Sequence, residues 1–304
     1  MPLPADAATG TTDTMPGVTL SLARRAWTLF EPIHAIVYFA PEAGEHYKAA
    51  GLRGGWMAYF ASRSAPMGAV TPGVVTAVFH NFQPAMVARA IPDAWHFSSP
   101  ERTLAARTAL ADAALRRLWG DAVDSADLSD AADTAMAVAR GLDGGGRPLY
   151  TATAGLEEPG APHLKLWHAC TLLREHRFDG HVAALTVHGL NGLESLVTAI
   201  AAGFEIDAPT IRRFRGWTEE EWEHGVERLR VRGIVDSAGA LTEEGRALRT
   251  GVEDATDRLA SDVWVAMEEP RRDRLFDQLH RLSVLLESPD GIRYPNPIGV
   301  SRPA

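Results

Sequence analysis

Apolar side chains in the first 230 residues recur every three or four positions, and no stretch there alternates convincingly with a period of two. A spacing of three or four places side chains on one face of an α-helix, whereas a period of two is typical of a β-strand. Proline and glycine divide the pattern into separate helices; for example, Ser99-Pro100-Glu101 should begin a helix that runs to Trp119. We therefore expect residues 18–180 to form an all-helical domain.

The composition limits the compartment. Cys170 is the one cysteine, so an internal disulfide is excluded, and no apolar run is long enough to span a bilayer. Residues 1–17 are small, polar and acidic and have no basic start or apolar middle, so we expect a disordered tail and no secretory signal. These features predict a cytoplasmic protein with no membrane partner. No glycine-rich phosphate loop is present, and the sequence identifies no cofactor.

The pattern changes after Phe178-Asp179-Gly180, which we expect to turn the chain between two domains. Residues 181–265 should form the second domain. Within it, Thr218-Glu219-Glu220-Glu221 is a capping-box start for a helix that ends near Arg232. The helix before it should cover Ala208 to Trp217.

The segment that follows is short and turn-rich. Ile234 to Thr242 indicates a two-stranded ribbon with a tight turn, and Thr242-Glu243-Glu244-Gly245 should begin a long helix to about Trp264. Residues 266–304 are expected to form a helix and tail that pack on the helical domain. The predicted fold class is therefore mainly α, with an N-terminal helical bundle followed by a winged-helix domain that has a small two-stranded β-ribbon.

Two resemblances bear on this fold. The segment ERLRVRGIVDSAGALTEEGRALRTGVEDATDRL, residues 227–259, resembles the MarR-type winged helix. The whole chain resembles an actinobacterial helix-turn-helix family through LFEPIHAIVYFAPEA, MAYFASRSAPMG, ARAIPDAW and LLREHRFDGHVAAL. The MarR likeness implies a second helix that enters the major groove of DNA. The family likeness implies architecture alone.

Charge decides whether such a domain can bind DNA. The net charge is −9, and the expected reading helix begins with Glu219, Glu220, Glu221 and Glu223, which would face phosphate. Six arginines flank this acidic stretch and could form a phosphate-binding stripe. They are Arg212, Arg213, Arg215, Arg228, Arg230 and Arg232. The alternative is that they pair with the nearby glutamates on a solvated face, which would leave a scaffold or dimerisation role.

A second concentration of polar residues lies between Leu166 and His188. Histidine and carboxylate are common transition-metal ligands, and the candidate ligands here are His168, Glu175, His176 and His181. Glu31 and His34 add a Glu-x-x-His pair of the kind that helix bundles use to bind two iron ions. None of the spacings is diagnostic, and each residue also fits a structural role, such as a hydrogen-bonded core histidine for His34.

The aromatic N-terminal segments suggest a third kind of site. Aromatic side chains at helical spacing usually form a core, yet an apolar pocket with a few polar groups is what a small-molecule sensor needs. The candidate pocket residues are His34, Trp56, Tyr59, Phe60, Arg63, His80 and Asn81.

The leading hypothesis is a transcriptional regulator, a homodimer whose helical domain binds a small apolar ligand and whose winged helix binds DNA. The alternative is a metal- or cofactor-dependent enzyme that uses the His/Glu/Asp cluster, with the winged helix as a structural part.

Overall fold

The computed structural model describes residues 21–303, so the tail expected over residues 1–17 lies outside the described residues. Sixteen α-helices fill the described part of the chain, joined by turns and three short 3-10 helices. Among these helices none is both long and apolar enough to cross a membrane.

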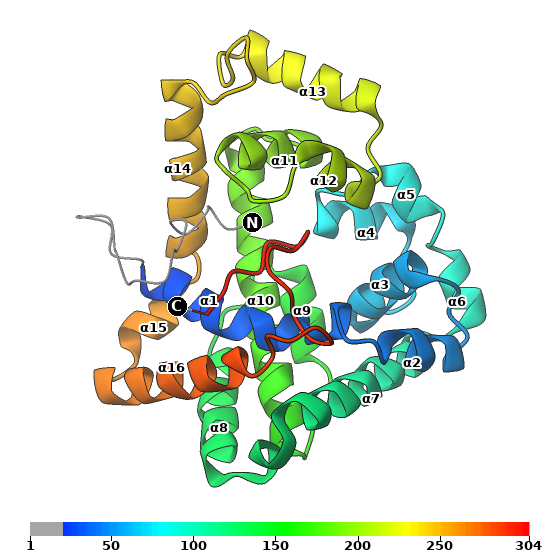
Figure 1. Ribbon diagram of the computed structural model, residues 1–304, viewed down its shortest axis with the longest axis vertical. Helices are drawn as coiled ribbons and strands as arrows, with labels where there is room; N and C mark the ends of the chain where they lie inside the picture. The colour runs from blue at the N-terminus through cyan, green and yellow to red at the C-terminus, as the bar shows by residue number, and fades with distance from the viewer. Residues whose placement is uncertain (1–20, 304) are drawn as a thin grey trace.

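Helix α10 (Pro162–Val187) is the central element of the molecule, and Figure 1 shows other helices on every side of it. It packs against α8 (Ala126–Arg140), α1 (Leu22–Ala35), α9 (Pro148–Ala154), α14 (Glu243–Arg258) and α7 (Pro100–Trp119). Because it is surrounded, it buries residues around its whole circumference and lacks the polar face of a surface helix.

The first hydrophobic core surrounds the N-terminal two thirds of α10. On one side α16 (Glu269–Val284) packs against α1 and α8 and follows α15 (Asp262–Ala266). On the other side the aromatic residues of a group of shorter helices interlock, with Phe60 and Phe82 centroids 4.9 Å apart. These helices are α2 (Ala43–Ala49), α3 (Gly55–Ser64), α4 (Pro72–Phe79), α5 (Pro84–Ala88) and α6 (Asp93–Phe97).

A second, smaller core forms around the C-terminal end of α10. It joins α11 (Gly192–Ala201), α12 (Ala208–Arg215), α13 (Glu219–Val231) and the first part of α14, which lie at the top of Figure 1. The capping box predicted at Thr218 is confirmed, because the Thr218 side chain accepts from the Glu221 N–H and Glu221 accepts from the Thr218 N–H.

The structure corrects the predicted winged-helix fold. The mainly α class fits, but residues 21–303 contain no strand and no sheet, so the two-stranded β-ribbon is absent. Between α13 and α14 one antiparallel bridge joins Val235 to Leu241. The segment is too short for more, since the Asp236 N–H already donates to the Ala240 carbonyl at 2.9 Å and closes the turn.

The turn expected at Phe178-Asp179-Gly180 is also wrong, because α10 runs through it without interruption. The reason lies elsewhere in the chain. A Cβ atom on Gly180 would come within 2.0 Å of Arg147 Nη1, so the glycine makes room for a guanidinium group. That group donates to the His176 carbonyl at 2.7 Å. The expected domain boundary at residue 180 therefore falls inside a helix.

A close backbone contact joins the two cores, and it generates a stability prediction. A Cβ atom on Gly192, the first residue of α11, would lie 1.9 Å from the carbonyl oxygen of His80. We expect Gly192→Ala to lower the free energy of unfolding by about 1–3 kcal/mol, as overpacking usually does. Gly44→Ala is the matched control, because nothing lies within 4 Å of a Cβ there. Equal midpoints of urea unfolding for the two variants would contradict the close approach of Gly192 to the His80 carbonyl.

Candidate functional site

Helices α12 and α13 are joined by a three-residue turn that is fixed by its own sequence. Gly216 adopts the left-handed conformation, with φ of 79°, which glycine tolerates without strain. Its Cα lies against Met86, where a Cβ would come within 2.7 Å of the sulfur. The Trp217 indole N–H donates to the Asn81 carbonyl at 3.0 Å. The turn is therefore anchored to the segment between α4 and α5.

A cavity of about 60 Å³ lies beneath this turn, between α12 and the first core. Its walls come from elements far apart in the sequence: α1, α3, α10, α12 and α14 all contribute. The aromatic walls are Trp27, Phe82 and Phe178, and the guanidinium groups that line it are those of Arg63, Arg174, Arg177 and Arg215.

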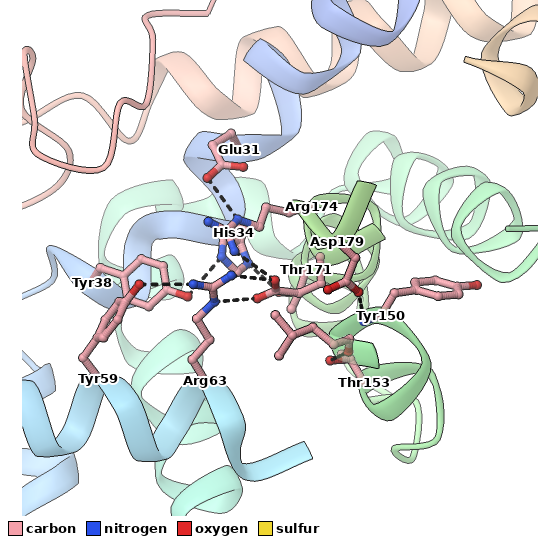
Figure 2. A network of polar contacts seen from close by, with 12 residues as sticks. Glu31, His34, Tyr38, Tyr59, Arg63, Tyr150, Thr153, Thr171, Arg174 and Asp179 are labelled. Atoms are coloured by element: carbon pink, nitrogen blue, oxygen red, sulfur yellow. Dashed lines mark hydrogen bonds and ion pairs between the residues drawn. The ribbon is translucent and has the colours of Figure 1, made fainter. Parts of the chain in front are cut away.

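The floor of the cavity is a buried ion cluster, shown in Figure 2. Arg63 Nε and Nη2 donate to the two carboxylate oxygens of Glu175 at 3.1 and 3.0 Å. Arg174 donates to Glu175 at 2.9 Å and to Glu31 at 3.3 Å. Although burial alone would raise the pKa of the Glu175 carboxyl, the attraction of Arg63 and Arg174 prevails and holds that pKa far below its usual range.

A second cavity, of about 210 Å³, lies on the other side of this cluster. Arg63 lines both cavities, and its partner Glu175 lines the second. His168 lines the second cavity, and burial lowers its pKa to about 4, which keeps the imidazole neutral near pH 7.

The sequence profile of a helix-turn-helix family matches residues 23–288. The chain belongs to this helix-turn-helix family. No curated protein and no solved structure matches it.

Of the arginines expected to bind DNA from the helix-turn-helix, most have carboxylate partners. Arg212 pairs with Glu219 at 3.4 Å, Arg228 with Glu194 at 2.8 Å, and Arg230 with Glu227. Arg213 is exposed and, within residues 21–303, has no carboxylate partner.

Arg215 is the exception and corrects the sequence interpretation. Its residue is only 5% exposed, and its guanidinium lines the cavity, so it is not on the surface where DNA would lie. The sequence contained a signal for this. Arg215 follows the buried Ile211 by four residues, and positions i and i+4 share one face of a helix.

The residues expected to form a ligand pocket fall into two groups. Tyr59, Arg63 and Asn81 line the cavity of about 60 Å³, which we call the arginine cavity because four arginines line it. The others lie around it: Phe60 is buried in the aromatic core, and Trp56 packs on Phe82 and Phe214. His80 closes α4, where its Nε2–H donates to the Leu190 carbonyl at 3.2 Å. We expected an apolar ligand; the lining combines apolar side chains with four guanidinium groups.

His34 lies one layer behind the cavity and is fully hydrogen-bonded (Figure 2). The Thr171 hydroxyl donates to the Trp167 carbonyl at 2.9 Å, so it accepts from His34 Nδ1–H at 3.1 Å. The Tyr38 hydroxyl donates to His34 Nε2 at 3.2 Å. Burial, reinforced by Arg174, holds the pKa of His34 well below its usual value. The neutral ring serves as a structural core histidine.

The four candidate metal ligands lie along α10 and are not brought together. Glu175 is committed to two arginines, His181 contacts the Thr256 hydroxyl at 2.9 Å, and His176 packs edge-on against Tyr150. In the described chain no three histidine, cysteine or acidic side chains lie close enough to hold a metal ion.

Sequence reasoning missed the arginine lining. Arg174 and Arg177 lie in the polar segment between Leu166 and His188, but only its histidines and Glu175 were chosen as candidates. A usable signal was the pair Arg174 and Arg177, because residues three apart lie on the same face of a helix.

The ion cluster predicts a large effect for its central carboxylate. Glu175→Ala leaves Arg63 and Arg174 buried without that partner, so we expect the free energy of unfolding to fall by about 3–5 kcal/mol. Glu227→Ala removes an exposed carboxylate that pairs with Arg230, and there we expect a loss below about 1 kcal/mol. Guanidinium denaturation measures both. Similar losses for the two variants would contradict a buried cluster.

Asp179 predicts a pH dependence. Burial raises the pKa of its carboxyl to about 7, although the Tyr150 N–H donates to it at 3.0 Å and opposes the shift. A raised pKa contributes stability that is present at low pH and lost as pH rises toward 7. We expect Asp179→Asn to unfold near the wild-type urea concentration at about pH 4, where the carboxyl is protonated in the folded protein and partly so in the unfolded chain, and to be more stable than wild type at pH 8 by on the order of 4 kcal/mol. A difference that does not vary with pH would refute this assignment.

Proposed function

We propose that this chain is a DNA-binding regulator of transcription, in which a small molecule in the arginine-lined cavity controls the position of α12 and α13. The observation that supports this proposal is the place of Arg215. It is the last residue of α12, directly before the turn, and its guanidinium is also a wall of the cavity. Any occupant that touches Arg215 therefore acts on the first helix of the helix-turn-helix.

Three hydrogen bonds connect the helix-turn-helix to the cavity wall at residues 81–83. The Gln83 N–H donates to the Arg215 carbonyl at 2.9 Å, and Trp217 donates to Asn81. The Gln83 side chain donates to Glu221, in the first turn of α13, at 3.1 Å. Asn81 and Phe82 line the cavity. A ligand that moves either residue would therefore act on the start of α13 directly through these hydrogen bonds.

Such a regulator needs two arrangements of α12 and α13 that the ligand distinguishes. A ligand shifts an equilibrium only by its difference in affinity for the two states, and about 1.4 kcal/mol gives a tenfold shift. Contact with a buried guanidinium is a sufficient source, because hydrogen bonds to charged groups contribute about 1.5–3 kcal/mol.

DNA would bind on the exposed side of α13. Arg213 on α12 and Arg228 and Arg230 on α13 are exposed, and the Arg230–Glu227 pair is open to solvent, whereas Glu194, the partner of Arg228, is buried. An exposed pair is worth about 0–1 kcal/mol, so phosphate can replace the Glu227 carboxylate at little cost. Glu220 and Glu223 remain exposed on the same helix and restrict the DNA sequences that fit.

We also propose a homodimer, since two copies of the helix-turn-helix would bind two half-sites about one helical turn apart. Light scattering of the full chain, alone and with the DNA described next, tests this arrangement.

The DNA test uses duplex DNA from the region upstream of the gene in a gel-shift assay across a salt series. We expect binding that weakens steeply with salt, because phosphate contacts release counterions. Arg213→Ala and Arg230→Ala should each reduce affinity and lower the salt slope by about one.

Arg116→Ala is the control, because Arg116 is an exposed arginine on α7 that pairs with Asp112 at 2.9 Å, away from the helix-turn-helix. The proposal fails if Arg213→Ala, Arg230→Ala and Arg116→Ala bind the DNA equally well, or if wild-type protein does not retard it at low salt.

A further inference from the structure

The arginine cavity carries more positive than negative charge. The four guanidinium groups that line it have three carboxylates as partners: Glu31, Glu175 and Asp257. Asp257 is also shared with Arg24, at 3.1 Å. Arg215 pairs with no carboxylate in residues 21–303; its Nη2 donates to the Pro297 carbonyl at 2.7 Å. The cluster as described is therefore short of at least one negative charge.

Two donor atoms of residues that line this cavity lack partners. Arg177 Nη1 and Arg215 Nε are buried, and no atom of the described residues accepts a hydrogen bond from either. Both residues are less than a tenth exposed, at 7% and 5%. A buried donor without an acceptor costs roughly 1–3 kcal/mol, and more when it is charged. Both atoms therefore call for an acceptor with negative charge.

We propose that this cavity is a binding site for a small oxyanion, a carboxylate or phosphate group held between Arg177 and Arg215. This proposal adds a ligand class to the proposed function. Oxyanion binding itself does not depend on the proposed function; only its role in regulation rests on it. Guanidinium groups donate in the planar geometry that carboxylate and phosphate oxygens accept.

Other groups in the cavity suit the same ligand. The Tyr59 hydroxyl accepts from Arg63 Nη1 at 3.3 Å, which leaves its own hydrogen free to donate to an oxyanion. Asn81 supplies a side-chain amide. Glu31 also lines the cavity, but its two oxygens already accept from Trp27 and Arg174, so its charge is compensated.

The size of the cavity restricts the ligand further. A buried water molecule needs a cavity volume of about 10–15 Å³, and an apolar cavity of about 150 Å³ can hold benzene. The 60 Å³ available here therefore suits a compact group of a few heavy atoms. An inorganic oxyanion fits, as does the terminal carboxylate or phosphate of a molecule that extends toward solvent.

The surroundings of Arg215 are electrostatically unfavourable. Burial lowers the pKa of Arg215 to about 10, which shows how poorly the surroundings solvate its charge. An oxyanion would reverse this effect and hold Arg215, and with it the end of α12, in the present position.

The experiment is a titration of the full-length protein with inorganic phosphate, sulfate, acetate and chloride at constant ionic strength. Thermal unfolding and calorimetry report binding without DNA. We expect a saturable rise in the melting temperature with phosphate or acetate and little with chloride. Phosphate and acetate arms distinguish a phosphate ligand from a carboxylate ligand.

Variants locate the site. Arg177→Gln and Arg215→Gln should weaken binding roughly ten- to hundredfold, as expected for loss of a hydrogen bond to a charged group. Arg213→Gln, two residues away and exposed, is the matched control and should bind like wild type. Asn81→Asp adds a carboxylate to the cavity with little change in shape, and it should abolish binding while the fold, followed by circular dichroism, is retained.

The proposal is overturned if wild-type protein shows no saturable response to any oxyanion, if chloride acts equally, or if Asn81→Asp binds like wild type. This result is separable from the gel shift. Oxyanion binding without DNA binding would overturn the regulator and leave the site, whereas DNA binding without oxyanion binding would do the reverse.

Discussion

The rest of the site depends on the ion pairs that the Glu175 carboxylate forms with two buried arginines. This carboxylate lies on the central helix and neutralises Arg63 from α3 and Arg174 from α10 itself, while Arg174 extends the network to Glu31 on α1. Guanidinium groups are costly to bury in an apolar core, and only opposite charges with good hydrogen-bond geometry offset that cost. Without this one acid, Arg63 and Arg174 would be buried at the meeting point of the three helices without their common partner.

Local signals in the sequence were sufficient for much of the fold. The helix expected from Ser99-Pro100 to Trp119 is confirmed as α7, and Ser99 caps it by accepting the Arg102 N–H at 3.2 Å. Such caps involve residues within one turn, so the sequence contains all that is needed to recognise them. Gly180 shows the limit. Its place inside α10 depends on Arg147, more than thirty residues earlier, and no local rule contains that contact.

The site was less accessible from sequence for a similar reason. Tyr59, Arg63 and Asn81 were chosen because aromatic residues at helical spacing lie close in sequence to a few polar groups, which is a local property. Arg215 was assigned to the surface because three arginines in one short helix resemble a basic face. Only the packing of Ile211 beside it turns that side chain inward. A protein with net charge −9 can thus carry a concentrated positive charge that is hidden inside it.

Helix α10 has 26 residues, about 39 Å, and contributes side chains to both hydrophobic cores. A chain cut near residue 180 would leave each fragment with part of a core and an unpaired apolar helix end. Each core therefore depends on a helix that it shares with the other, and a substitution that disrupts α10 would weaken both cores.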